Sequence, residues 1–121
     1  MLSLYAQGNR YPYVNSGTNS VNSGDVITLA PGTAAGTGHI GIALSAITAS
    51  GGLGELSTGG YPEGVYTLAK NAGEAFTDGQ ILYWDAVNKW LTGTAGSLVR
   101  AGRSFGTAIS AATTATLSLN R

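Results

Sequence analysis

The chain has 121 residues, of which only 10% are charged, and its 6 Lys and Arg balance its 6 Asp and Glu to zero formal net charge. This length favours one domain, and the lack of cysteine excludes disulfides and thiolate metal sites. Without an excess of positive charge, the chain is not expected to bind nucleic acid or an anionic membrane. Weakly charged surfaces tend to associate, so we expect a partner to cover part of this one.

The beginning of the chain carries no basic region followed by an apolar stretch, as a signal peptide would. No segment approaches the roughly 20 apolar residues of a spanning helix. We therefore expect a soluble protein that is made in the cytoplasm. We further expect residues 1–10 to form an N-terminal arm and residues 11–121 to form a single β domain.

Glycine, asparagine and aspartate pairs that favour turns recur about every eight to twelve residues, a spacing typical of many short strands. In the segment 80–84 the neighbours Tyr83 and Trp84 must point to opposite faces, so at least one should lie in the core. The expected hairpin turn of residues 85–88 joins this segment to the next strand. The predicted strands are 11–14, 26–30, 40–44, 65–69, 80–84, 89–92, 98–101, 104–109 and 115–120.

Helix is the weaker expectation, because glycine and β-branched residues lower helix stability. The best helical candidate is the segment 41–50, where four apolar residues could form one stripe. We therefore predict an all-β fold, a compact antiparallel barrel or sandwich of short strands with at most a short helix.

Two patterns suggest enzymatic chemistry, but neither has the context that it needs. Residues 36–41 have the spacing of a dinucleotide-binding glycine loop, with Glu55 near the position of a ribose-binding acid. That loop works at the start of a helix within a βαβ unit, and neither a helix nor strand–helix alternation is predicted. His39, the only histidine, has no carboxylate at metal-ligand spacing, and no serine occupies a Gly-x-Ser-x-Gly elbow. We predict no catalytic residue, no cofactor and no metal.

Three aspartates could be read as paired carboxylates for acid–base catalysis. Asp25 and Asp78 each adjoin a glycine, and Asp85 follows an aromatic strand. Because aspartate at such positions bonds to the local backbone, we predict that all three are turn residues.

Arginine and tyrosine residues are the candidates for contact with a partner. Arg100 and Arg103 form the only basic cluster, and arginine is enriched in protein–protein interfaces. Tyr11 and Tyr13 flank a proline, which favours an edge strand because proline cannot donate to a ladder. An edge position would leave this aromatic pair accessible.

A series of short motifs follows a fixed order along the chain. Its centre is GVYTLAK at 64–70, AGEAF at 72–76, DGQ at 78–80 and YWD at 83–85. It is flanked by SGDV at 23–26, GIA at 41–43, GTA at 106–108 and TATLSLN at 114–120. In order and spacing the series resembles the capsid cement family of tailed bacteriophages, roughly from residue 5 to residue 120. The segments 31–39 and 95–103 are longer than in the family pattern.

This resemblance implies a structural, non-enzymatic protein on the outside of a phage head, where it bridges neighbouring major capsid protein subunits and stabilises the expanded shell. It also implies a homo-oligomer, a dimer or trimer, with the major capsid protein and sister copies as partners. The contact residues that we expect are in the arm and the adjacent strand, followed by the arginine pair and last by the loop 32–38. They are Leu2, Leu4, Tyr5, Tyr11, Tyr13, Arg100 and Arg103.

Three alternatives remain at this point. The chain could be another virion β domain, such as a tail or baseplate component that forms rings or tubes alone. It could be a glycan- or receptor-binding module that uses exposed tyrosine and tryptophan. The remotest alternative is a small enzyme that uses His39 with a nearby carboxylate.

Overall fold

A computed structural model describes residues 10–29, 39–58 and 65–119, and these residues form nine strands and no helix. The predicted all-β class is therefore confirmed. None of these residues belongs to a helix that is long and apolar enough to cross a membrane. The strands are β1 (Arg10–Asn15), β2 (Val26–Leu29), β3 (His39–Ala43), β4 (Gly52–Ser57), β5 (Val65–Ala69), β6 (Ile81–Asp85), β7 (Trp90–Thr92), β8 (Val99–Ser104) and β9 (Thr114–Leu119).

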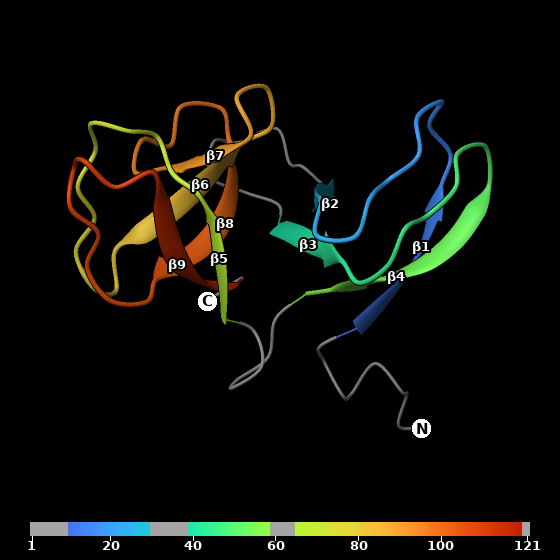
Figure 1. Cartoon of the computed structure of the whole chain (residues 1–121), viewed down its shortest axis with the longest axis horizontal. Coiled ribbons are helices and arrows are strands. Elements are labelled where there is room, and N and C mark those ends of the chain that lie inside the picture. The colour runs from blue at the N-terminus through green and yellow to red at the C-terminus, as the bar shows by residue number, and fades with distance from the viewer. Residues whose placement is uncertain (1–9, 30–38, 59–64, 120–121) are drawn as a thin grey trace.

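The strands form two antiparallel sheets that lie side by side (Figure 1). The four-stranded sheet has the order β1-β4-β3-β2, and the five-stranded sheet has the order β5-β9-β8-β6-β7. The second sheet curves into a half-barrel, because its two edge strands meet where Lys70 bridges to Leu91. As predicted, β6 and β7 form a hairpin across residues 86–89.

Strand β3 connects the two sheets because both of its faces are buried. Ile40 and Ile42 point into the larger core, which the half-barrel lines with Phe76, Leu82 and other apolar residues. On the opposite face Ala43 belongs to a smaller core with Leu56. Alternation of side chains along a strand produces this division, so β3 packs against a different set of residues on each side.

Gly41 is required on the second face of β3. A Cβ atom at this position would lie 2.9 Å from Leu56 Cδ1 and 3.0 Å from Leu56 Cβ. Such distances are too short for two carbon atoms, which reach their optimum near 3.5–4.0 Å. The absence of a side chain therefore lets β3 and the smaller core approach closely.

Lys70 fixes the end of β5 to the segment that precedes β9. The side chain is only 3% exposed, and its Nζ donates to the carbonyls of Asn71, Ser110 and Ala112 at 3.1, 3.3 and 3.1 Å. The same nitrogen lies 5.4 Å from the centre of the Phe76 ring. All three ammonium donors thus have backbone acceptors, as a buried lysine requires.

Glu74 fixes the neighbouring turn to the end of β7. Its carboxylate accepts hydrogen bonds from Asn71 Nδ2 and Thr92 Oγ1, both at 2.7 Å, and from the Gly93 N–H at 3.0 Å. Partial burial raises the pKa of Glu74. The hydrogen bonds from Thr92, Gly93 and Asn71, together with the charge of Lys70, outweigh that effect and lower the pKa below its ordinary value of 4.5.

Three sequence-based expectations were wrong in detail, and the weaker helical alternative did not form. The strand expected at 104–109 does not form, because the chain turns at Gly106, whose N–H donates to Asp78 Oδ1 at 2.8 Å. The segment expected at 98–101 extends to Ser104 as β8. The helical candidate 41–50 is the end of β3 followed by bends. Strand β4 was not predicted, because Gly52 and Gly54 interrupt its apolar pattern.

The close approach at Gly41 predicts the effect of adding a single methyl group. The variant Gly41→Ala should be less stable by about 1–3 kcal/mol, because overpacking forces β3 away from Leu56. Urea unfolding followed by tryptophan fluorescence measures this change. An unchanged unfolding midpoint would contradict the assignment of β3 as a strand buried on both faces.

The hydrogen bonds to Glu74 predict a pH dependence of stability. Because folding lowers its pKa, the carboxylate stabilises the fold above its unfolded pKa, and this stabilisation is lost as the pH falls through the lower folded pKa. Wild-type stability should therefore decline below about pH 4.5.

The variant Glu74→Gln isolates this contribution. It should be less stable than the wild type at pH 7 by about 1–2 kcal/mol, because an amide nitrogen would face one of the donors. Urea unfolding at pH 7 and at pH 3 should give a smaller difference between the two proteins at pH 3. A constant difference across this range would rule out the role of Glu74. Asp85 titrates in both proteins, so its effect cancels.

Candidate functional site

The outer face of β1 and β4 carries an exposed apolar pair. Val14 and Leu53 stand directly opposite each other in the register of the two strands, and their side chains are 53% and 78% exposed. Pro12 is also exposed on this side of β1. Since β1 pairs only with β4 among the described residues, it is an edge strand, as the proline predicted. Neither Val14 nor Leu53 was selected from the sequence.

The signal for this pair was partly present in the sequence. Val14 shares the face of Pro12 through simple alternation along β1. Leu53 lies in the run Gly51 to Gly54, which resembles a turn rather than a strand. Only the pairing of β1 with β4 shows that the two side chains meet on one surface.

Of the tyrosines expected at the interface, only Tyr13 has a side chain that the structure describes. Tyr13 lies on the opposite face from Val14 and is half-buried against the smaller core. The backbone of Tyr11 belongs to β1, opposite Leu56, and its side chain lies outside the description. Leu2, Leu4, Tyr5 and the loop 32–38 also lie outside the described residues. A contact role for these residues stays a prediction.

A β-bulge brings the two arginines to one face of the half-barrel. Arg100 and Arg103 are three residues apart, so regular alternation along β8 would place them on opposite faces. In the pairing with β6, however, Ala101 and Gly102 together stand opposite Leu82. This extra residue reverses the alternation, and Gly102 accommodates it with a φ of 149°. Both arginine side chains consequently lie outside the core.

The surroundings of the arginines are partly polar and partly aromatic. Arg103 is exposed, and its Nη1 donates to the carbonyl of Gly79 at 2.9 Å. Arg100 is half-buried and stands opposite Tyr83, which is half-exposed on the outer face of β6. Trp84 points inward and belongs to the larger core, as its adjacency to Tyr83 predicted. Phe105 follows β8 directly and is exposed.

The three aspartates take part in turns, as expected. Asp25 accepts from the Asn22 N–H at 2.9 Å, and Asp78 accepts from Gly106. Asp85 accepts from the backbone and side chain of Asn88 and from the Val87 N–H, and these hydrogen bonds lower its pKa. Asp25 and Asp85 therefore bond within their own turns, whereas Asp78 bonds to a turn 28 residues further along the chain.

His39 begins β3 and is half-buried, opposite Leu29. Among residues 10–29, 39–58 and 65–119, no group of three or more His, Cys, Asp or Glu side chains is arranged to hold a metal ion. The described surface thus offers apolar and arginine-bearing patches rather than a convergent set of titratable groups. Such patches are typical of protein interfaces.

Comparison with known proteins gives one match. A family model described as a phage cement protein matches residues 5–119, nearly the whole chain. No curated protein and no solved structure matches it. The matched range contains the motif series together with both sheets and both cores, so the match covers the complete described fold. The chain belongs to the phage cement protein family.

Proposed function

We propose that this protein binds to the outside of the phage head and bridges neighbouring major capsid protein subunits after the shell expands. The observation that carries this proposal is the family match over residues 5–119. In this role the protein is made in the host cytoplasm, acts without catalysis and joins the virion as a dimer or trimer.

The described surfaces support a bridging role physically. The Val14–Leu53 pair on the four-stranded sheet and the arginine pair on the half-barrel belong to different sheets. A bridge needs at least two contact areas, because simultaneous engagement of two subunits raises the effective affinity far above that of each contact. Both areas are carried by strands of packed sheets, so little conformational entropy is lost on docking.

The assigned interface combines the residues expected from the sequence with the exposed apolar pair. Aromatic and arginine side chains contribute most where an interface becomes dry, and exposed apolar side chains gain most from being covered. The capsid and oligomer interface residues are Leu2, Leu4, Tyr5, Tyr11, Tyr13, Val14, Leu53, Arg100 and Arg103.

The role of the arm is tested by truncation. A variant without residues 1–5 should keep its fold, because the part of the chain that the structure describes forms both cores with residues from Tyr13 onward. It should no longer bind heads, since three of the assigned contacts are removed. Co-sedimentation with expanded heads that lack the cement protein measures this, and circular dichroism checks the fold. Unchanged binding by the folded variant would overturn the role of the arm.

The role of the Val14–Leu53 pair is tested with two variants, each of which introduces one carboxylate at an exposed position. Leu53→Asp should reduce affinity for expanded heads by about tenfold or more, because burying an unpaired carboxylate in an interface is costly. The matched control is Val87→Asp, at an 89% exposed position in the β6–β7 turn. Co-sedimentation titrations should show loss only for Leu53→Asp. Equal losses, or no loss in either variant, would remove the β1–β4 face from the interface.

A further inference from the structure

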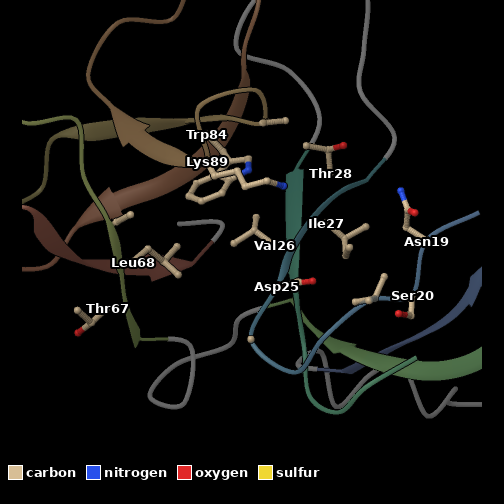
Figure 2. A pocket seen from close by; sticks show the side chains of 14 residues that line it. Asn19, Ser20, Asp25, Val26, Ile27, Thr28, Thr67, Leu68, Trp84 and Lys89 are labelled. Atoms are coloured by element: carbon tan, nitrogen blue, oxygen red, sulfur yellow. The ribbon is translucent and has the colours of Figure 1, made fainter. Parts of the chain in front are cut away.

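Two grooves border the β6–β7 hairpin. The first has a volume of 460 Å³, and Trp84 lines it together with residues of β2 and β5 (Figure 2). The second, which we call the β7 groove, has a volume of 620 Å³, and none of its residues belongs to the interface assigned above. Both volumes are within the roughly 300–1,000 Å³ typical of binding pockets. The lining of the β7 groove combines one tryptophan with polar side chains and includes Asn71, Glu74, Asp85, Asn88, Trp90 and Thr92.

The sheet places Trp90 between two polar turns. Trp90 stands opposite Asp85 in the pairing of β7 with β6. Its neighbour Leu91 is fully buried in the larger core, so alternation along β7 turns the Trp90 side chain to the outer face. On the other side of β7, the Asn71 N–H donates to the Leu91 carbonyl at 3.0 Å. Trp90 is half-buried, so part of its surface is exposed between Asp85 and Asn71.

Each of the two asparagines in the groove is oriented by a carboxylate. Asn71 Nδ2 donates to Glu74 Oε2 at 2.7 Å, and Asn88 Nδ2 donates to Asp85 Oδ2 at 2.8 Å. Because the pKa of each carboxyl group is lowered, both are ionised at neutral pH. An ionised carboxylate only accepts hydrogen bonds, so it fixes which end of each amide faces it.

The amide groups that remain unused match the hydroxyl groups of a sugar. Within the described part of the chain, neither Asn71 Oδ1 nor Asn88 Oδ1 accepts a hydrogen bond. Each amide also keeps one N–H, because Nδ2 carries two hydrogens and the carboxylate takes one. An acceptor and a donor side by side on one plane can pair with two adjacent hydroxyl groups. Since both amides are held in place before a ligand arrives, little conformational entropy is lost on binding.

The tryptophan and the two carboxylates narrow the class of ligand. The face of an aromatic ring carries partial negative charge, so it attracts positively polarised hydrogens such as the C–H groups on one face of a pyranose. The ionised Glu74 and Asp85 disfavour phosphate groups and acidic sugars. Each carboxylate already accepts three hydrogen bonds, of about four that it can accept, which leaves little capacity to bind a cation.

We propose that the β7 groove binds a neutral saccharide. One face of a pyranose packs on Trp90, and hydroxyl groups of the same saccharide bond to the amides of Asn71 and Asn88. This binding function goes beyond the bridging of capsid subunits and does not depend on it. Where many copies stand on one surface, weak binding by each groove adds up to a much higher avidity.

Sugar titrations of the isolated protein, followed by NMR, test the proposal. The probes are the methyl glycosides of glucose, galactose, mannose and N-acetylglucosamine, each from roughly 1 to 100 mM, because so small a ligand gains limited affinity. We expect at least one of them to shift the signals of the Trp90 indole N–H and of the Asn71 and Asn88 amides in a saturable way. Trp84 lies in the larger core and is the internal control, so its indole signal should move several-fold less.

A pair of asparagine variants locates the binding. Asn88→Ala removes one amide at an exposed position of the β6–β7 turn and should weaken binding by about fivefold or more, because its hydrogen bonds to the sugar are lost. The matched control is Asn22→Ala, which removes an exposed asparagine from the Asp25 turn and should leave the affinity unchanged. Equal affinities of the two variants would overturn the site.

Charged probes separate the remaining classes of ligand. The methyl glycoside of glucuronic acid and inorganic phosphate should leave the Trp90 signal in place, because Glu74 and Asp85 repel anions. Saturable shifts with arginine amide and none with the four neutral glycosides would identify a cation site and overturn the proposal. Shifts that rise linearly with every probe, or no shift with any neutral glycoside, would overturn it as well. Because the isolated protein is used, none of these outcomes bears on head binding.

Discussion

The burial of β3 on both faces is the constraint on which the rest of the structure depends. Its isoleucines complete the larger core of the half-barrel, and its other face supports the smaller core under β1 and β4. Gly41 makes this possible by letting Leu56 approach the strand. The exposed surface of β1 and β4 is thereby attached to the half-barrel that carries the arginines. The proposed bridging function needs this attachment, because force between two capsid subunits would pass through the core of the bridging protein.

The motifs that identify the family are mainly turn chemistry. In the segment 72–76 the central glutamate ties its turn to β7 through three hydrogen bonds. Asp78 ties the next turn to Gly106, and Asp85 closes the β6–β7 hairpin. Asp78 and Asp85 were predicted to be structural, because aspartate beside a strand favours backbone bonding, although Asp78 bonds to a distant turn. The role of Glu74 was not predicted. These motif residues therefore stabilise the scaffold, and the proposed contact residues Val14 and Leu53 lie outside the motifs.

Local rules predicted the strands that alternate cleanly, such as β5 and β9, and the hairpin of β6 and β7. They did not predict β4, because Gly52 and Gly54 interrupt its apolar pattern, and the packing of Ile47 over Gly54 appears only in the folded chain. Only part of the candidate site was predictable from the sequence. The arginines were selected by type, but their shared face depends on a bulge at Ala101 and Gly102 that appears only in the pairing with β6. The Val14–Leu53 pair depends likewise on a partner strand that was missed.

The low charge of the chain has a more specific meaning once the charges are placed. Lys70 is buried among backbone carbonyls, Asp85 accepts hydrogen bonds from its own turn, and Glu74 and Asp78 accept hydrogen bonds from residues far along the chain. Several of the few charged groups therefore stabilise the scaffold, and the outer face of β1 and β4 presents apolar side chains. Exposed apolar pairs of this kind favour association, and in the proposed role zero net charge would limit repulsion between neighbouring copies. Several charged groups of this protein thus maintain the fold, while apolar side chains are exposed on the outer face of β1 and β4.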